Sequence, residues 1–302
     1  MRSQEFTDRL FTAPLCCDGA MGTQLFSRGL TAGECGMLWN VDRSADVRVV
    51  HEEYRRAGCE LITTNSFGGS ASVLVRHGLA NRVAELNHAA AQIARIAAGN
   101  TGWVLGDVGP FGDFLEPLGD TTPEELREIF REQIEALLAG GADAILVETM
   151  SDPAEAAVGV EAAKSCAADV PVIVTYAFQK SGLGVFHTMM GSSVEQAIRS
   201  ARAAGAQVVG ANCGTSLGLD DYVDLAKQIV AFADGAPVII QPNAGAPRAE
   251  GERTVYDATP VQMAAAASQL LAAGVRIVGG CCGTTPGHLA AISAACHSPS
   301  DT

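Results

Sequence analysis

The fold is constrained most by a series of eight short apolar segments, most of them with β-branched residues and each followed by a helical pattern. These segments cover residues 14–17, 60–64, 103–107, 144–147, 171–175, 207–212, 237–240 and 275–280. Such runs are typical of buried parallel strands, whose crossover connections are helices. Eight strand-and-helix units favour one closed (β/α)8 barrel, a TIM barrel, over an open doubly wound sheet. We therefore expect a single barrel domain over residues 1–297 and a disordered tail over 298–302.

Several helix starts carry capping signals, in which a polar side chain accepts hydrogen bonds from the first free amides. These signals are Thr122-Pro123-Glu124-Glu125, Asp152-Pro153, Ser192-Ser193-Val194-Glu195, Thr259-Pro260 and Thr285-Pro286. The first and third have the spacing of a capping box, from Thr122 to Glu125 and from Ser192 to Glu195. The first predicts a helix that runs to about residue 139. A further helix is expected to begin near Asp42, after a long loop.

Composition excludes several classes of partner. The formal net charge is −14, and no run of basic residues occurs, so neither a nucleic acid nor an anionic membrane surface is expected as a partner. No uninterrupted apolar stretch is long enough to cross a membrane, and the N-terminus lacks the apolar core of a signal peptide. We therefore expect a cytoplasmic protein. The glycine-rich signatures of dinucleotide-binding and P-loop folds are also missing.

Three of the nine cysteines follow predicted strands directly. Cys213 ends the sixth strand, and the adjacent pair Cys281 and Cys282 ends the eighth. Because active sites of such barrels lie at the carboxyl ends of the strands, we expect the three sulfurs to converge there on a zinc ion. The alternative is two packed thiols or a vicinal disulfide, with Cys213 as a small core residue. Packing alone is expected for the scattered cysteines, which are Cys35, Cys59, Cys166 and Cys296.

Three thiolates leave a fourth zinc position open, which is typical of a catalytic site. An electron-rich zinc of this kind activates water poorly, but it can hold a thiol substrate as the thiolate. Since a free thiol titrates near pH 8.5, coordination removes a barrier to nucleophilic attack at neutral pH. The cysteine pattern therefore predicts the alkylation of a thiol.

Other polar residues follow the remaining predicted strands. Asp18 and Glu148 are two carboxylates suited to hold a substrate ammonium, although one of them could instead be an ordinary structural acid. Asn65 and Asn243 could hydrogen-bond substrate, or Asn243 could give an oxygen to zinc when substrate is absent; a role in a turn is an equal alternative for each. Trp39 could face a cationic methyl donor, but simple packing is favoured. His187 is expected not to be a ligand.

In combination and in order, these motifs resemble the homocysteine S-methyltransferases, a family that includes betaine-homocysteine methyltransferase and the homocysteine module of cobalamin-dependent methionine synthase. The resemblance covers nearly the whole chain and depends on Asp18-Gly19-Ala20-Met21-Gly22-Thr23, Thr63-Thr64-Asn65-Ser66-Phe67, Gly106-Asp107-Val108-Gly109-Pro110, Glu148-Thr149, Asn212-Cys213 and Gly279-Gly280-Cys281-Cys282-Gly283. It implies that the three cysteines bind Zn²⁺, that homocysteine takes the fourth position, and that the product is methionine. The substrate site expected from it consists of Asp18, Gly19, Thr23, Asn65, Glu148 and Asn243.

The methyl donor is where the family divides. Gln241-Pro242-Asn243-Ala244-Gly245 is similar to both branches of the family, whereas His187-Thr188-Met189-Met190-Gly191 is more similar to bacterial betaine-type enzymes. Thr149 follows Glu148, in place of the aromatic pair of the animal betaine enzyme, so an identical donor cage is not expected. We also expect no cobalamin or folate module in these 302 residues. A small onium donor such as betaine or S-methylmethionine is therefore favoured.

Three alternatives remain open from the sequence. The methyl group could come from a methylcorrinoid carried by a separate protein. The zinc site could serve another thiol or transfer methyl groups to a corrinoid protein. A zinc-storage or redox-sensing protein is disfavoured, since it would give no reason for acids and asparagines at the other strand ends.

Overall fold

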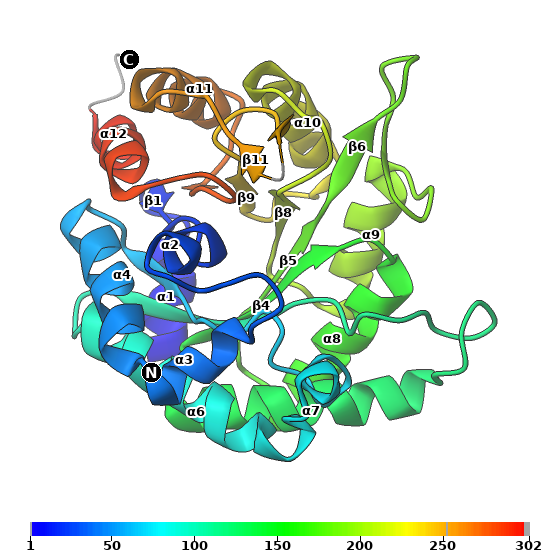
Figure 1. Cartoon of the computed structure of the whole chain (residues 1–302). Helices are drawn as coiled ribbons and strands as arrows, with labels where there is room; N and C mark the ends of the chain where they lie inside the picture. The colour runs from blue at the N-terminus through cyan, green and yellow to red at the C-terminus, as the bar shows by residue number, and fades with distance from the viewer. Residues whose placement is uncertain (1, 252, 299–302) are drawn as a thin grey trace.

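The computed structural model describes residues 2–251 and 253–298, and its centre is a barrel of eight parallel strands. The hydrogen-bonded order is β1-β12-β9-β8-β5-β4-β3-β2. A parallel bridge between Cys17 and Leu61 then joins β1 to β2, with the Asp18 amide donating to the Leu61 carbonyl at 3.0 Å. The predicted (β/α)8 barrel is confirmed (Figure 1). Its strands are β1 Leu15–Cys16, β2 Leu61–Thr63, β3 Trp103–Val108, β4 Ala144–Met150, β5 Val172–Tyr176, β8 Val208–Asn212, β9 Val238–Gln241 and β12 Ile277–Val278.

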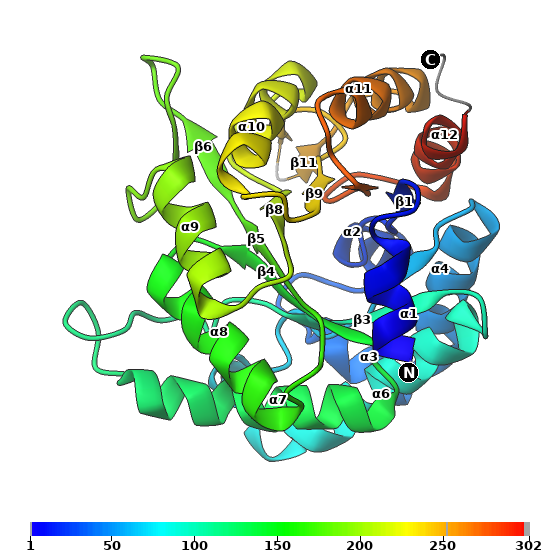
Figure 2. The same ribbon diagram turned by 180° about the vertical axis from the view of Figure 1, so that it is seen from behind.

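Helices between successive strands form the outer layer of the barrel (Figures 1 and 2). The helix expected near Asp42 begins two residues later, after the short α3 Trp39–Asp42. The outer helices are α4 Ser44–Arg56, α6 Val83–Ala98, α7 Pro123–Gly140, α8 Pro153–Cys166, α9 Val194–Ala204, α10 Leu219–Phe232, α11 Pro260–Ala272 and α12 Pro286–His297. The predicted tail at 299–302 lies outside the described residues.

The capping signals locate these helices closely, with one correction. Thr122 and Glu125 form the predicted capping box of α7, and Asp152 accepts from the Ala154 amide at 2.8 Å. The cap of α9 is Ser193, paired with Gln196, so the predicted box from Ser192 to Glu195 is wrong by one residue. Ser192 is held outside the helix, because its carbonyl accepts from the Thr188 amide at 2.9 Å. Gln at the third helical position closes the box as well as Glu does, so the spacing alone did not decide between the two registers.

The barrel interior and the helix layer form two separate apolar clusters, because alternate residues of a strand face opposite sides. Leu15 and Cys17 point inward, while Cys16 packs against the helices. The N-terminal helix α1 Arg2–Arg9, which lies in front in Figure 2, adds Phe6 to the interior cluster. It closes the end of the barrel opposite the carboxyl ends of the strands.

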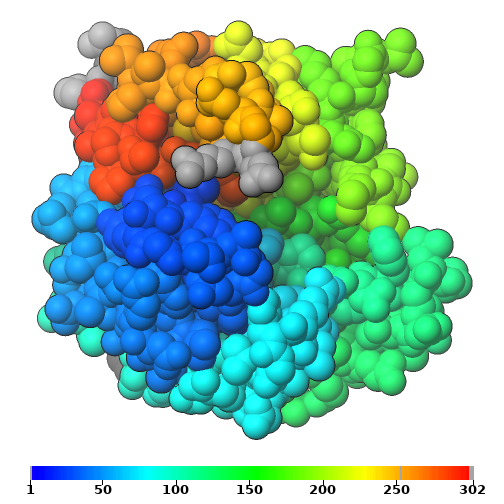
Figure 3. Space-filling view, in the orientation of Figure 1, coloured from blue at the N-terminus to red at the C-terminus, as the bar shows by residue number. Residues whose placement is uncertain are grey.

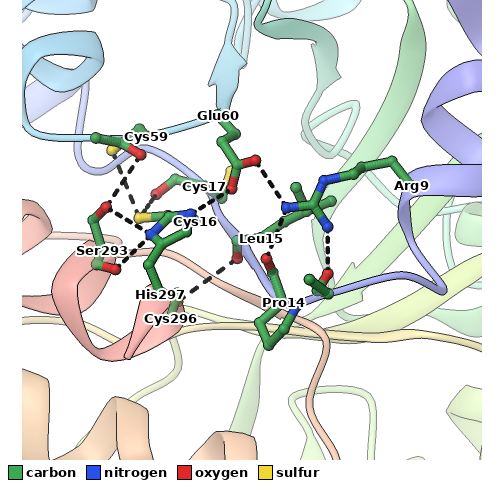
Figure 4. A network of polar contacts seen from close by, with 12 residues as sticks. Arg9, Pro14, Leu15, Cys16, Cys17, Cys59, Glu60, Ser293, Cys296 and His297 are labelled. Carbon is green, nitrogen blue, oxygen red and sulfur yellow. Dashed lines mark hydrogen bonds and ion pairs between the residues drawn. The ribbon is translucent and has the colours of Figure 1, made fainter. Parts of the chain in front are cut away.

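A polar network connects α1 to the segments that precede β1 and β2 (Figure 4). Arg9 donates to Glu60 at 3.0 Å and to the carbonyls of Ala13 and Pro14. His297, at the end of α12, lies 3.2 Å from the other oxygen of Glu60. The first helix and the last thus hold the segment that precedes β2.

Cys16 and Cys59 lie in the same region, with their sulfurs 3.9 Å apart. Of the four scattered cysteines, Cys35, Cys59 and Cys296 are buried and Cys166 is half-buried. Each is a free thiol away from the three cysteines of the predicted zinc site. The packing role expected for them agrees with these positions.

The connections at the carboxyl ends of the strands are more elaborate than the sequence indicated. The loop after β1 contains α2 Gly22–Ser27 and η1 Gly36–Leu38, and the loop after β2 contains α5 Ala71–Leu74, η2 Val75–His77 and η3 Ala80–Arg82. Two antiparallel hairpins rise from the same rim, formed by β6 Phe178–Lys180 with β7 Phe186–Thr188 and by β10 Arg248–Glu250 with β11 Arg253–Val255 (Figure 1). The turn predicted at 181–184 connects the first hairpin. Over the described ranges, the helices are all too short or too polar to cross a bilayer.

Candidate metal centre and substrate cavity

The three cysteines predicted from the strand ends come together in space. The sulfur atoms of Cys213, Cys281 and Cys282 all lie within 4.8 Å of one another. Three sulfurs about 2.3 Å from one ion at tetrahedral angles lie about 3.8 Å apart, so small side-chain adjustments would bring this trio onto a zinc ion. All three cysteines are free, which excludes the predicted alternative of a vicinal disulfide in this structure.

The backbone around Cys213 is held in an unusual conformation. Its φ of 51° lies in the left-handed region, which costs about 1–2 kcal/mol for a residue other than glycine. The buried Tyr222 donates a hydrogen bond to the Cys213 carbonyl, and the Cys213 amide donates to the Gln241 carbonyl at 3.3 Å. Such strain persists where neighbouring groups determine the conformation, and it is common at functional sites.

The loop after β12 is packed equally tightly. Gly283 has a φ of 79°, and a Cβ added to it would lie 2.3 Å from Cγ of Tyr256. The ring of Tyr256 therefore occupies the space that a side chain at position 283 would need. Only glycine allows the Cys281-Cys282 pair to turn into α12 beneath this ring.

The pKa values of the clustered thiols are shifted in opposite directions. Hydrogen bonds from Cys213 and then Cys281 lower the pKa of Cys282 to about 3. Hydrogen bonds to Cys213 and Cys282, together with burial, raise the pKa of Cys281 well above its ordinary value. One thiolate is thus already stabilised by its neighbours, as a cation site requires.

The cysteine trio opens into a cavity of about 610 Å³ at the carboxyl ends of the strands. Figure 3 shows a hollow on this face, beside the blue segment that contains α2. Most of the cavity wall is apolar and comes from the loops after β1 and β2. Its apolar residues there are Met21, Leu25, Phe26, Leu30, Met37, Phe67 and Val73. Phe26 and Phe67 are exposed, at 54% and 43%. Of the described residues that line the cavity, none is Lys, Arg or His.

Three carboxylates line the same cavity, at the ends of β1, β3 and β4. Asp18 accepts from the Thr63 amide at 2.8 Å, and burial raises its pKa to about 7. Burial, and then repulsion from Asp18, raises the pKa of Glu148 to about 8. Burial also raises the pKa of Asp107 well above its ordinary value, with Glu148 and Asp18 adding to the shift. Crowded carboxylates of this kind hold protons until a cation arrives.

The remaining residues predicted for the substrate site are placed as follows. Gly19 and Thr23 line the cavity, and the Thr23 hydroxyl is buried without a hydrogen-bond partner among the described residues. A Cβ at Gly19 would lie 2.6 Å from the Thr284 hydroxyl, so glycine allows the turn after β1 to pack against the start of α12. Asn65 also lines the cavity, but its amide group donates to the Gly36 carbonyl at 2.9 Å and to Asn40 at 2.9 Å.

Asn243 lies behind the cavity wall. Its amide nitrogen donates to the Gly214 carbonyl at 3.4 Å, and its side-chain oxygen has no partner among the described residues. Asn243 is buried next to the cysteine loops, and its predicted roles in binding substrate or zinc stay predictions.

Trp39 and His187, the two ring side chains considered as donor or ligand contacts, lie outside the cavity lining. The guanidinium of Arg43 lies 3.7 Å from the centre of the Trp39 ring and covers one of its faces, and Trp39 is only 7% exposed. His187 sits in the β6–β7 hairpin, with Nδ1 3.0 Å from the Thr188 carbonyl. The favoured expectations for these two residues, packing for Trp39 and no ligand role for His187, agree with this geometry.

Two residues that the sequence reasoning did not assign belong to the site. Asp107 ends a predicted strand in the same way as Asp18 and Glu148, and this position was the signal that could have identified it. Asn212 directs its amide nitrogen to the Thr149 hydroxyl at 2.7 Å and to the Cys281 sulfur at 3.8 Å. No sequence signal marks Asn212 apart from its place before Cys213.

The chain matches a known protein family over almost its whole length. The family model described as homocysteine S-methyltransferase matches residues 15–296. The chain belongs to the homocysteine S-methyltransferase family. The family prediction is therefore confirmed, and with it the class of enzyme, a methyltransferase.

Similar proteins include longer ones. The chain is 33% identical over 295 residues to methionine synthase of Mycobacterium tuberculosis (strain ATCC 25618 / H37Rv). The matched region covers 92% of this chain and 24% of that protein. Methionine synthase of Mycobacterium leprae (strain TN) is 32% identical over 297 residues, with the same coverage. The chain thus spans about a quarter of the length of these relatives.

A solved structure resembles the chain over almost its whole length. The metallated form of the homocysteine methyltransferase MmuM from Escherichia coli matches with a TM-score of 0.77 and 25% identity. The match covers 97% of this chain and 99% of MmuM. It agrees with the observed barrel in both topology and extent.

Proposed function

We propose that this chain is a zinc-dependent homocysteine S-methyltransferase that makes methionine from a small onium methyl donor. The observation that carries the proposal is one cavity with a trio of thiols on one side and three buried carboxylates on the other. Homocysteine has a thiol at one end and an ammonium group at the other, so its two ends match the two sides. MmuM, a homocysteine methyltransferase by name, is similar in structure and exists in a metallated form.

The metal would be held by Cys213, Cys281 and Cys282. Their spacing suits a tetrahedral ion, and sulfur-only sites favour zinc over the harder divalent cations. When bound, zinc would lower the pKa of a substrate thiol at the open fourth position, which makes the sulfur a nucleophile at neutral pH. The thiol proton would leave the cavity or pass to one of the carboxylates whose pKa is raised.

The carboxylates would hold the amino group. Burial and the neighbouring acids favour the protonated forms of Asp107 and Glu148 in the empty site, and an ammonium group would favour their ionised forms. The oxygen Oδ1 of Asp107 is buried without a partner among the described residues, so it is free to accept a hydrogen bond from substrate. The unpartnered Thr23 hydroxyl and the backbone at Gly19 would meet the carboxylate end of homocysteine.

The apolar outer wall supports a cationic donor. A sulfonium or quaternary ammonium methyl group is weakly hydrated and would fit among Met21, Phe26 and Phe67, and its charge would be attracted by any of the three acids that is ionised. The alternative, a methylcorrinoid on a separate protein, draws support from the methionine synthase relatives, whose length exceeds that of this chain about fourfold. A donor assay separates the two.

The test is to incubate the purified, zinc-loaded chain with homocysteine and one donor at a time: S-methylmethionine, betaine or methylcobalamin. Methionine is measured by mass spectrometry. Formation from S-methylmethionine or betaine supports the proposal, formation from methylcobalamin alone supports the alternative, and no methionine from any donor would refute the activity.

The metal assignment is tested separately with Cys282→Ala. This variant should lose bound zinc and turnover, because two thiolates bind zinc far more weakly than three. Cys166→Ala, which removes a half-buried thiol from another part of the barrel, is the matched control and should keep one zinc per chain. A Cys282→Ala protein with one zinc and full activity would overturn the ligand assignment.

A further inference from the structure

The three cysteines are connected through the end of β9. In the barrel β9 lies between β8, which leads to Cys213, and β12, which leads to the Cys281-Cys282 pair. The Gln241 carbonyl accepts from the Cys213 amide at 3.3 Å, and the Pro242 carbonyl accepts from the Cys281 amide at 2.8 Å. The Ala244 amide donates to the Cys282 carbonyl at 2.9 Å. Residues 241–244 therefore set the distance between Cys213 and the other two thiols.

One buried side chain completes this connection. Tyr222 lies on α10, is 0% exposed, and donates its hydroxyl hydrogen to the Cys213 carbonyl. The backbone N–H of Asn243 donates to the same hydroxyl oxygen, at 3.5 Å. Tyr222 thus binds the loop of Cys213 on one side and the end of β9 on the other.

The Cys213 loop needs such a restraint more than the other cysteines do. Cys213 and Ser216 have φ values of 51° and 60°, and neither is a glycine. Without a partner for its carbonyl, the Cys213 peptide could rotate to an unstrained conformation and move its side chain. The pair at 281–282 has no positive φ, because Gly283 takes the left-handed conformation for that loop.

We propose that Tyr222 is a positioning residue of the metal centre, whose hydroxyl keeps Cys213 in the left-handed conformation that points its sulfur at the ion. The inference rests on the proposed zinc site. It predicts that the hydroxyl contributes to metal affinity, while the aromatic ring contributes to the packing of α10. Partners of metal ligands contribute about 10- to 100-fold to metal affinity in other proteins.

The test compares two variants that each remove one buried tyrosine hydroxyl. Tyr222→Phe removes the hydroxyl that holds Cys213. Tyr176→Phe is the matched control: Tyr176 is also 0% exposed, it lies on β5 next to β8, and its hydroxyl has no partner among the described residues. Zinc affinity is measured by chelator competition, the geometry at the site by the absorption spectrum of the cobalt-substituted protein, and fold stability by thermal unfolding of the metal-free protein.

We expect zinc affinity to fall about 10- to 100-fold in Tyr222→Phe, with a changed cobalt spectrum, and to stay at the wild-type value in Tyr176→Phe. Equal affinity and an unchanged spectrum in Tyr222→Phe would overturn the inference, even if its unfolding temperature fell, because the role would then be structural only. Equal losses in both variants would overturn it too. A wild-type chain that binds no zinc would instead refute the proposed function, so the two failures are distinguishable.

Discussion

Replacing Asp18 with Asn should stabilise the metal-free protein while it weakens substrate binding. Burial raises the pKa of Asp18 from 3.8 to about 7 in the folded chain. The folded state therefore holds this proton more tightly than the unfolded state does. The stability that this gives is fully present below pH 3.8 and is lost as the pH rises through 7.

The magnitude follows from the two pKa values. Between pH 5 and pH 8 the wild-type protein should lose about 2–3 kcal/mol of unfolding free energy through Asp18 alone. Asparagine cannot ionise, and its side-chain oxygen can still accept from the Thr63 amide, which lies 2.8 Å from the native carboxylate. The stability advantage of Asp18→Asn should thus grow by about 2–3 kcal/mol from pH 5 to pH 8.

The assay is urea denaturation of both proteins at the two pH values, with a chelator present so that no metal charge reaches the cavity. Asp120→Asn, which removes a charge from an exposed loop after β3, controls for the change in net charge. Homocysteine KM should rise about 10- to 150-fold in Asp18→Asn, since hydrogen bonds to a charged group contribute about 1.5–3 kcal/mol. A stability difference that is the same at pH 5 and pH 8 would refute the reasoning.

Two further predictions concern parts of the barrel away from the cavity. His51 is buried on α4, neither ring nitrogen has a partner among the described residues, and burial lowers its pKa from 6.5 to about 4. The stability that the neutral imidazole gives is present above pH 6.5 and is lost as the pH falls towards 4. Between pH 8 and pH 5 the unfolding free energy of the wild-type protein should therefore fall by about 2 kcal/mol relative to that of His51→Leu, as measured by urea denaturation. Parallel pH profiles of the two proteins would contradict this. A Cβ at Gly210 would lie 1.8 Å from the Ile239 carbonyl, so Gly210→Ala should push β8 away from β9, lower the unfolding free energy by about 1–3 kcal/mol and weaken zinc binding at Cys213. Gly182→Ala is the control, because nothing lies within 4 Å of the added carbon, and equal melting temperatures of the two variants would refute the steric explanation.

The sequence predicted the barrel well because the relevant signals are local. Most central strands contain β-branched residues, and α7, α8, α9, α11 and α12 begin with a polar cap or a proline, so strand ends could be located to within a few residues. Once the strands are placed in a closed barrel, Cys213 and the pair Cys281-Cys282 are expected at the same rim, on strands with β9 alone between them. The predicted zinc ligands needed no knowledge of loop structure.

What the sequence did not predict depends on contacts between distant segments. Helix α1 is mostly polar, and its role depends on distant contacts: Phe6 packs into the barrel end and Arg9 donates to Glu60. Asn65 uses its amide group on Gly36 and Asn40, and Trp39 is covered by Arg43; neither partner follows from the motif in which the residue occurs. Asp107 could have been assigned, since it shares the strand-end position of the other two acids.

The acids and the cysteines of the cavity come from different strands of the barrel, which affects how a bound ligand would connect those strands. The acids belong to β1, β3 and β4, whereas the sulfurs belong to β8 and β12, so an amino-acid thiol that touches both sides spans the molecule from one half to the other. The shortest strands, β1 and β12, lie side by side where these halves meet. Occupation of the cavity would thus connect the two groups of strands across the β1–β12 pair, whose ladder consists of only two residue pairs.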